Sequence, residues 1–368
     1  MSTTFEPMSE NTKVETAKAL LSVKSLTSPE KYEKIRGILV ESMHTGAIEK
    51  SIIGLSKEDE FALMCKLIGT ATQLVHLEQR PTIKGDFQVP DFLACFKPGY
   101  LAGGKTSSDH NGFRCLVEVK STQDTEYSIS GGRLRKLRAF ANQFGFPLVF
   151  AVRFLRVEEH AFWMITEDDT SRTKLTISYN DLVSGLRKVL WDDFMYMVNP
   201  WIHFQILYDS SIPDNSETLR HTEYGQQTEF QIVSRENSSA NGNVTPGNIH
   251  RVTGVDAMSL AAFFECFQPE VVDVKKHGTI TYEVWQVKKP CSVTDLVYIF
   301  NRLPRDEKGR ALLDPSRVLA GTDNESGLIT RSGVDNIARG MWGSVLSSFS
   351  FGCPEDHLQQ WIRTGGKV

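Results

Sequence analysis

Two short apolar runs decide the fold: VPDFLA at residues 89–94 and LVEVKS at residues 116–121. Each run has the length and composition of a buried strand, yet each carries an acidic residue, Asp91 in the first and Glu118 in the second. Successive side chains of a strand leave on opposite faces, so Glu118 and Lys120 share one face. A carboxylate and an ammonium group on an apolar strand are costly to bury without compensation. If the two runs are neighbours, they bring Asp91, Glu118 and Lys120 to one place.

Carboxylates at the same level of two adjacent strands favour a site for a hard divalent cation. Mg²⁺ takes oxygen ligands and commonly binds through one or two carboxylates, with water and substrate phosphate completing its coordination. Asp91 and Glu118 are the predicted ligands, and Lys120 would hold an attacking water or the phosphate. The chemistry that this arrangement predicts is metal-assisted phosphodiester hydrolysis. The competing interpretation makes Asp91 a turn residue and Glu118 the partner of Lys120 on a solvated face.

A basic helix and a further apolar strand follow the second run. Residues 130–145 have apolar positions at helical spacing, with Ser130 as a plausible cap and Gly145 at the end. Residues 146–154 form an apolar run of buried-strand type. The basic residues of the helix lie off its apolar face: Arg133, Arg135, Lys136 and Arg138. They would add salt-sensitive, sequence-independent affinity for a nucleic-acid backbone, unless they only form a solvated face.

The order strand, strand, basic helix, strand, with Pro90-Asp91 and Glu118-Val119-Lys120 on the strands, resembles the PD-(D/E)xK nuclease superfamily. Residues from about 56 to 166 are most similar to its archaeal Holliday junction resolvase-like branch. The resemblance implies an α/β fold with a restriction-endonuclease-like core, in which a mixed central sheet is flanked by helices. It also implies that Asp91, Glu118 and the backbone carbonyl of Val119 bind Mg²⁺, or alternatively Mn²⁺. Lys120 would orient the attacking water or help to deprotonate it.

The resolvase-like branch also has a glutamate on the helix before the first strand, pointing into the metal site. Glu60 is the best match, in a helix predicted to begin near Ser56, and Glu58 and Glu78 are the alternatives. The segment KPGYLAGGKTSSDHNG, residues 97–112, is predicted to be a surface loop between the two strands. Its functional alternative is a substrate-facing flap in which Lys105 contacts phosphate.

The activity that the resemblance implies is Mg²⁺-dependent endonuclease cleavage of DNA, of the restriction, phage-defence or junction-resolving type. The expected partner is double-stranded or branched DNA, and a homodimer is expected because such enzymes cut two strands. One alternative is a catalytically inactive nuclease-like subunit for nucleic-acid binding or assembly. A further alternative is an RNA endonuclease. Fold and metal site are shared among these activities and do not choose between them.

The length of 368 residues predicts more than one domain. The expected division is an N-terminal helical segment (1–55), a nuclease-like domain with an aromatic-rich extension (56–235), a linker (236–250) and a C-terminal α+β domain for DNA binding or assembly (251–368). The linker is the Gly-, Asn- and Ser-rich stretch ENSSANGNVTPGNIH. Aromatic residues crowd between 191 and 208, which favours a packed core over a surface that stacks on bases.

Bulk composition limits the remaining possibilities. The net charge of -4 gives no global attraction to nucleic acid, so a local basic patch must supply it. Six cysteines without C-x-x-C spacing predict neither a zinc site nor a disulfide framework. No apolar run approaches the ~18 residues of a membrane span, and the start of the chain is polar. We therefore expect a cytoplasmic protein with no membrane partner and no small-molecule organic cofactor.

Overall fold

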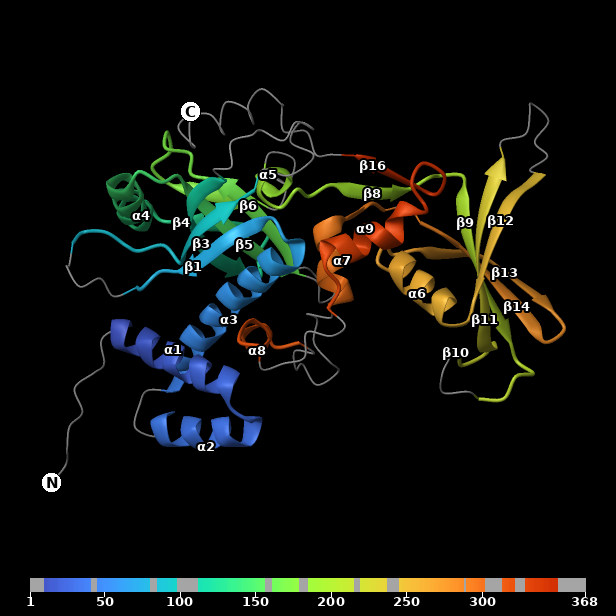
Figure 1. Cartoon of the computed structure of the whole chain (residues 1–368), viewed down its shortest axis with the longest axis horizontal. Helices are drawn as coiled ribbons and strands as arrows, with labels where there is room; N and C mark the ends of the chain where they lie inside the picture. The colour runs from blue at the N-terminus through green and yellow to red at the C-terminus, as the bar shows by residue number, and fades with distance from the viewer. Residues whose placement is uncertain are drawn as a thin grey trace. The chain divides into compact units, whose positions relative to one another are not determined.

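The computed structural model describes residues 10–40, 45–79, 85–97, 112–155, 161–178, 185–214, 219–236, 245–287, 289–301, 313–321 and 328–349 (Figure 1). The chain divides into two compact units. Unit 1 consists of Met1–Asp193, Val297–Ser332 and Phe351–Val368, and unit 2 consists of Phe194–Leu296 and Gly333–Ser350. The chain therefore leaves unit 1 after its first long segment and later returns to it.

This division differs from the one that composition predicted. The expected linker overlaps two antiparallel neighbours in one sheet, β11 (Gly225–Glu236) and β12 (Thr245–Thr253). Gly, Asn and Ser are as common in the turns between paired strands as in linkers, so composition does not distinguish the two. Strands from residues 270–286 join the same sheet as residues 202–236, so 251–368 is not a separate domain.

Unit 1 is built around a five-stranded sheet. Its strand order is β1 (Ala71–His76), β2 (Phe92–Phe96), β3 (Phe113–Thr122), β5 (Leu148–Leu155) and β6 (Ala161–Glu167). β3 and β5 are parallel, whereas the other neighbours are antiparallel. Parallel strands need a crossover connection, and α4 (Gly131–Phe144) lies in the connection from β3 to β5. This arrangement confirms the predicted mixed sheet with flanking helices.

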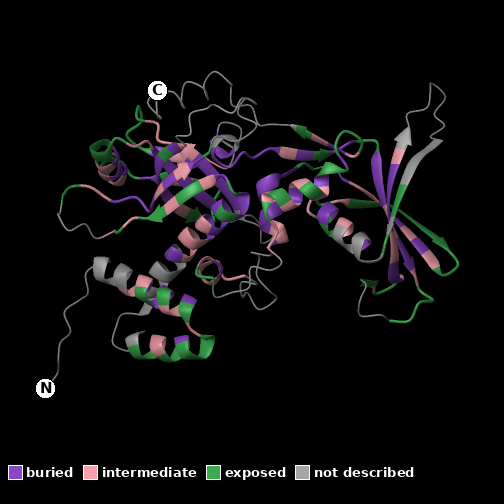
Figure 2. Cartoon of the chain, viewed as in Figure 1, coloured by how far each residue is buried: buried purple, intermediate pink, exposed green. Residues whose placement is uncertain are grey.

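Helices cover both faces of this sheet, and its inner strands β2, β3 and β5 are largely buried, whereas the edge strand β1 is not (Figures 1 and 2). On one face, Phe61 of α3 (Thr45–Ile68) packs on Phe92, with 5.9 Å between ring centroids. On the other face, Leu134 of α4 shares a buried cluster with Leu116 of β3. The start of β2 and the middle of β3 lie inside the sheet, between these two apolar layers. Any charged group there is placed in an environment of low polarity.

The other elements of unit 1 are short or lie outside the sheet. They are α1 (Glu10–Leu26), α2 (Pro29–Val40), β4 (Glu126–Ile129), β7 (Leu175–Ser178), α5 (Arg187–Leu190) and α8 (Pro315–Leu319). β4 and β7 pair antiparallel. α3 begins at Thr45 rather than near Ser56, so the expected boundary at 55/56 falls inside one helix. Gly54 costs only about 1 kcal/mol relative to alanine within a helix, which is too little to end it.

Unit 2 is a second, mainly antiparallel body. Its larger sheet has the order β10 (Arg220–His221), β11, β9 (Ile202–Asp209), β14 (Ile280–Gln286) and β13 (Glu270–His277), with β12 beside β11. Its smaller sheet has the order β15 (Cys291–Ser292), β8 (Met195–Val198) and β16 (Leu346–Phe349). α6 (Gly254–Glu265) packs Phe264 on Phe204 of β9, at 4.0 Å between ring centroids. The predicted packing of the aromatic run is confirmed for most of it, since Trp191, Tyr196 and Phe204 are buried, whereas Trp201 is exposed.

Two helices, α7 (Val293–Phe300) and α9 (Arg331–Arg339), contain residues of both units. None of the helices within the described ranges combines the length and the apolar composition needed to cross a membrane.

Candidate active site

β2 and β3 bring the charged residues of the two apolar runs together. Asp91 immediately precedes β2, which is the antiparallel neighbour of β3. The backbone N–H of Val119 donates to Asp91 Oδ2 at 2.7 Å, and Lys120 Nζ lies 3.4 Å from the same oxygen. Lys120 Nζ also lies 2.8 Å from Glu118 Oε1. Asp91, Glu118 and Lys120 therefore meet within contact distance, although they are far apart in the sequence.

Glu118 is the most deeply buried of these groups, with 0% of its surface exposed. Its Oε1 accepts from Lys120 and from Nη2 of Arg133, the latter at 2.9 Å. Its Oε2 has no hydrogen-bond partner among the described residues. Burial, and after it the negative charge of Asp91, raises the pKa of the Glu118 carboxyl, while Lys120 and Arg133 oppose that shift. A buried carboxylate oxygen without a partner is costly, so a further ligand at this oxygen would be stabilising.

Lys120 is held as an ammonium ion by its surroundings. Burial acts to lower the pKa of Lys120, but Asp91 and Glu118 together raise it above its ordinary value. Its Nζ also donates to the backbone carbonyl of Val119. At neutral pH Lys120 is therefore a hydrogen-bond donor and a fixed positive charge, and it has no lone pair with which to accept a proton.

Glu60, the acid that the resemblance assigned to the site, belongs to a different cluster. Arg153 Nε donates to Glu60 Oε1 at 2.6 Å, and Lys57 Nζ donates to Glu60 Oε2 at 3.3 Å. Arg153 Nη2 also donates to the hydroxyl of Tyr298 at 3.3 Å. Both oxygens of Glu60 thus have cationic partners in the described part of the chain, and Glu60 does not join the acids of β2 and β3.

Glu58 is the acid of α3 that acts on the site. Burial, and then the charge of Asp91, raises the pKa of the Glu58 carboxyl to about 9, with Lys120 opposing the shift. Residues two apart on an α-helix point about 200° apart around its axis, so Glu58 and Glu60 project in nearly opposite directions. Glu58, an alternative in the sequence, therefore takes the place of Glu60 in the candidate site.

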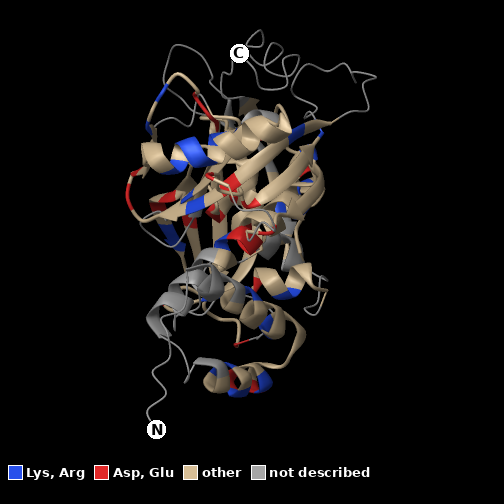
Figure 3. Ribbon diagram, turned by 90° about the vertical axis from the view of Figure 1, so that its left-hand side faces the viewer, with Lys and Arg blue, Asp and Glu red and all other residues tan. Residues whose placement is uncertain are grey.

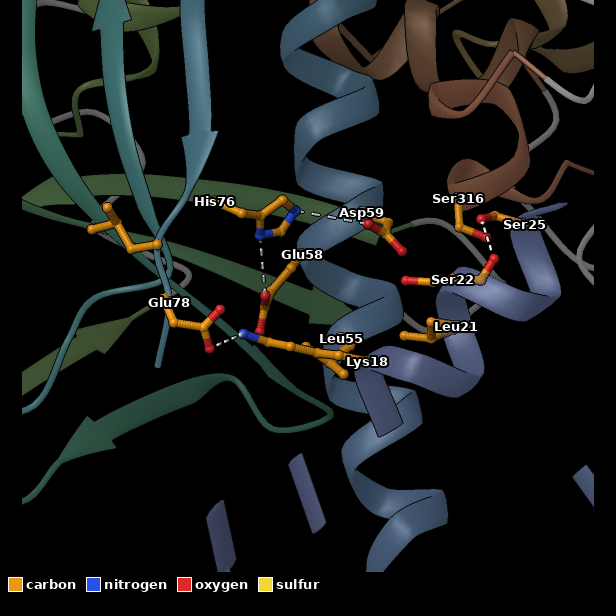
Figure 4. Close-up of a pocket in the computed structure, with 11 residues that line it drawn as sticks. Lys18, Leu21, Ser22, Ser25, Leu55, Glu58, Asp59, His76, Glu78 and Ser316 are labelled. Carbon is orange, nitrogen blue, oxygen red and sulfur yellow. Dashed lines mark hydrogen bonds and ion pairs between the residues drawn. The ribbon is translucent and has the colours of Figure 1, made fainter. Parts of the chain in front are cut away.

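A cavity of about 390 Å³ borders the site on the side of Glu58 (Figure 4). The His76 ring lies beside Glu58, with Nδ1 3.7 Å from Glu58 Oε2. Leu77 lines the cavity, and its N–H donates to the backbone carbonyl of Asp91 at 3.0 Å. Glu78, the other alternative acid, also lines the cavity, with a side chain that is 67% exposed. Its exposure and its contact with Lys18 separate it from the buried carboxylates.

The basic residues of α4 differ in their partners. Arg133, in the first turn, pairs with Glu118 of the acidic site. Arg135 and Lys136 lie 3.6 Å and 3.2 Å from the exposed side chain of Asp86. Exposed ion pairs of this kind contribute little stability, so Arg135 and Lys136 can exchange Asp86 for another anion at low cost.

Among the basic residues of α4 that were predicted to contact phosphate, Arg138 makes the most hydrogen bonds to other parts of the protein. Its Nε and Nη2 donate to the two oxygens of Asp168 at 2.7 Å and 2.6 Å. It also donates to the backbone carbonyls of Asp169 and Arg172. Such a bidentate, carbonyl-supported arginine is a structural tie between α4 and the segment after β6. Lys105 lies outside the described residues.

Acidic and basic residues are interspersed over unit 1 in Figure 3. The net charge of -4 also gives the chain no global attraction to nucleic acid. Any attraction must come from individual side chains near the site, such as Arg133, Arg135 and Lys136 of α4.

The donor set at Asp91 and Glu118 fits a hard divalent cation with few protein ligands. It offers two carboxylates, the unpartnered Oε2 of Glu118 and the carbonyl of Val119. Within the described ranges, no three or more His, Cys, Asp or Glu side chains gather closely enough to hold a metal ion by themselves. Mg²⁺ tolerates such a sparse set because it retains several waters and takes substrate phosphate as a ligand.

Comparison with known proteins adds little to this geometry. No protein-family model matches the chain, and no curated protein matches its sequence. Among solved structures, the chain is similar to Hjc, a Holliday junction resolvase from the archaeal hyperthermophile Archaeoglobus fulgidus. The TM-score is 0.25 and the sequence identity is 16%, over 36% of this chain and 93% of that chain.

Proposed function

We propose that unit 1 has a PD-(D/E)xK-like core and is a Mg²⁺-dependent endonuclease that hydrolyses DNA. The observation that carries this proposal is Glu118: a carboxylate without exposed surface, beside a second acid, with one oxygen bonded to cations and the other without a partner in the described residues. A purely structural ion pair would satisfy both oxygens. The chemistry of this site does not separate restriction, phage-defence and junction-resolving enzymes, or double-stranded from branched DNA.

In this proposal each residue of the site has a distinct role. Asp91, Glu118 and the carbonyl of Val119 would hold Mg²⁺ or Mn²⁺. When bound, the ion would polarise the phosphoryl oxygen and offset charge on the leaving oxygen. Lys120, held as a cation, would donate to the attacking water or to the phosphate and fix its position. Glu58 would be the further acid beside this pair, in place of Glu60, and not a third direct ligand.

A second candidate function is a nuclease-like subunit for nucleic-acid binding or assembly, without catalysis. It is favoured by the cations at Glu118, since Lys120 and Arg133 compensate its charge without a metal ion. It is also favoured by the absence, within the described ranges, of a cluster of three metal-ligating side chains. The partnerless Oε2 of Glu118 argues for the enzyme, because an assembly module has no reason to retain it.

Cleavage of supercoiled plasmid and of a branched DNA junction, with MgCl₂ and with EDTA, tests the proposal. The wild-type protein should cut only with Mg²⁺, and Asp91→Asn and Lys120→Ala should be inactive while remaining folded by circular dichroism. Asp124→Asn is the matched control, because Asp124 is an exposed acid just beyond β3. Equal cutting by all four proteins would remove the assignment of these residues.

The same proteins should be assayed on single- and double-stranded RNA. If the protein cleaves only RNA and Asp91→Asn abolishes that cleavage, the assignment of the active site stands and the substrate is RNA instead of DNA. Binding of nucleic acid without cleavage of any form would establish the second candidate function.

A further inference from the structure

Arg133 has an incomplete bond to the acidic site. Its Nη2 donates to Glu118 Oε1 at 2.9 Å, but its Nε is buried and has no hydrogen-bond partner among the described residues. Arginine is suited to a two-point contact in which neighbouring N–H groups meet two oxygens of one carboxylate or phosphate. Arg138, on the same helix, makes that contact with Asp168. In its contact with Glu118, Arg133 thus uses only one of the two N–H groups with which it could bind a carboxylate or phosphate in a bidentate contact.

Lys120 and Arg133 are held to Glu118 in different ways. The Lys120 side chain is 16% exposed and lies between Asp91 and Glu118, so it remains close to both acids. The Arg133 side chain is 40% exposed and reaches the site from the first turn of α4. It can therefore leave Glu118 for an anion arriving from solvent without crossing a packed layer. Lys120 cannot do so without abandoning two carboxylates.

The charges of these four side chains affect how strongly a divalent cation is bound. Asp91 and Glu118 are offset by Lys120 and Arg133, so the four groups sum to zero net charge. Departure of Arg133 leaves a net negative charge and exposes Glu118 Oε1 to a ligand. At a site of low effective dielectric constant, such a change strongly affects cation binding.

Resting on the proposed nuclease function, we propose that Arg133 couples metal binding to nucleic-acid binding. Without nucleic acid, Arg133 is the counter-ion of Glu118 and competes with the metal ion. A backbone phosphate at the site takes the guanidinium through Nε and Nη2, and Glu118 is released to the metal. Metal and nucleic acid then strengthen each other's binding by the same factor, as thermodynamic linkage requires. At a given metal concentration, the metal site is therefore filled to a greater extent when substrate is present.

Calcium binding measured by isothermal titration calorimetry, with and without a saturating DNA duplex, tests this coupling without depending on turnover. Ca²⁺ is an oxygen-seeking cation, and gel electrophoresis after the titration verifies that the duplex is intact. In the wild-type protein the duplex should tighten Ca²⁺ binding at least about tenfold, within the usual range of coupling between sites. In Arg133→Gln, Ca²⁺ should bind more tightly than in the wild type without DNA, and the duplex should tighten it less than about threefold.

Arg114→Gln is the control for the loss of one positive charge. Arg114 lies on the same strand as Glu118 but is exposed, and its replacement should leave both Ca²⁺ affinities as in the wild type. Equal coupling in Arg133→Gln and wild type would overturn the inference. So would equal tightening of Ca²⁺ binding in Arg114→Gln and Arg133→Gln, since that would show a general charge effect.

Glu118→Gln separates failure of this inference from failure of the proposed function. If Ca²⁺ binds Glu118→Gln as it binds the wild type, or binds neither, the proposed metal site itself is wrong. If Glu118→Gln abolishes binding but Arg133→Gln retains the wild-type coupling, only the role of Arg133 is wrong. An NMR resonance of the Arg133 Nε–H, identified by its loss in Arg133→Gln, should shift when DNA is added to the wild type.

Discussion

Two buried glutamates of unit 1, Glu60 and Glu118, differ in how their carboxylate oxygens are hydrogen-bonded. Glu60 has a cationic partner at each carboxylate oxygen, Arg153 at 2.6 Å and Lys57 at 3.3 Å. Glu118 is more deeply buried, yet two cations share its Oε1 and nothing in the described residues bonds to its Oε2. Both residues lie in an apolar setting with basic neighbours, so burial and charge alone do not distinguish them.

What distinguishes the two clusters is the completeness of their hydrogen bonding. A saturated ion pair gains its full set of hydrogen bonds in the folded state and has no capacity for a ligand. An unsaturated carboxylate retains a cost of burial that a metal ion or a substrate can relieve. We therefore interpret the Glu60 cluster as structural and the Glu118 cluster as functional. The following predictions test that difference, from the largest expected effect to the smallest.

Exchange of each glutamate for glutamine should affect activity very differently. Glu118→Gln should lower DNA cleavage at least about 100-fold, because changes even to groups that only support metal ligands cost 10- to 100-fold. Glu60→Gln should retain cleavage within a few-fold, measured below its unfolding temperature. Initial rates of plasmid nicking at saturating Mg²⁺ check both. Comparable losses in the two variants would mean that Glu60 also serves catalysis and that the comparison fails.

Removal of the arginine that pairs with each glutamate should affect stability in the reverse order: the unfolding free energy should fall more for the Glu60 cluster than for the Glu118 cluster. Arg153→Met leaves Glu60 buried with a weakened set of partners, which costs about 3–5 kcal/mol when a buried pair is broken. Arg133→Met removes a cation that is 40% exposed and should change the unfolding free energy by less than about 1 kcal/mol. Urea unfolding followed by circular dichroism measures both.

The double variant Glu60→Leu/Arg153→Met provides the control for that measurement. Replacing both members of a buried pair by apolar residues is often neutral, so the double variant should recover most of the stability that Arg153→Met loses. A double variant as unstable as the single one would show that Arg153 acts through other contacts, such as Tyr298.

Glu58 should make stability depend on pH. Its pKa is raised from 4.5 to about 9, chiefly by burial, so the folded state favours the protonated carboxyl. The stabilisation from this group is fully present below the pKa of the unfolded chain, near 4.5, and is lost as pH rises through about 9. The difference in unfolding free energy between wild type and Glu58→Gln should therefore fall as pH increases over this window.

Glu126→Gln is the control for that titration, because Glu126 is exposed. Its difference from the wild type should not change with pH. A constant difference for Glu58→Gln as well would show that the Glu58 carboxyl is not buried in solution as it is in the structure.

The smallest effect is expected at the edge of the Glu60 cluster. Tyr298→Phe removes the hydroxyl that accepts from Arg153 at 3.3 Å, and should reduce the unfolding free energy by about 1 kcal/mol. DNA cleavage should be unchanged. Urea unfolding resolves this difference, and a loss as large as that of Arg153→Met would instead mean that Tyr298 holds the whole cluster together.

Local sequence patterns were sufficient for the inner strands of the sheet of unit 1. The apolar runs at residues 89–94, 116–121 and 146–154 correspond to β2, β3 and β5, and the basic helix corresponds to α4. The period of side-chain burial and the turn residues at the ends are local properties, and they can be read without knowledge of distant contacts. The domain boundaries failed for the opposite reason: strands between 270 and 286 pair with β9 of the earlier segment, which no local composition reveals.

In the candidate site, the sequence by itself determined which residues of β3 would share a face, since strand alternation places Glu118 and Lys120 together. It also supplied Asp91 at the start of a second apolar run. Only the tertiary structure decided that Glu58 and not Glu60 turns to the site, and that Arg133 and not Arg138 reaches Glu118. The orientation of each helix about its own axis decides which of several similar residues, close together in the sequence, faces the site. Local chemistry thus supplied the acids and the lysine, whereas packing decided which neighbours surround them.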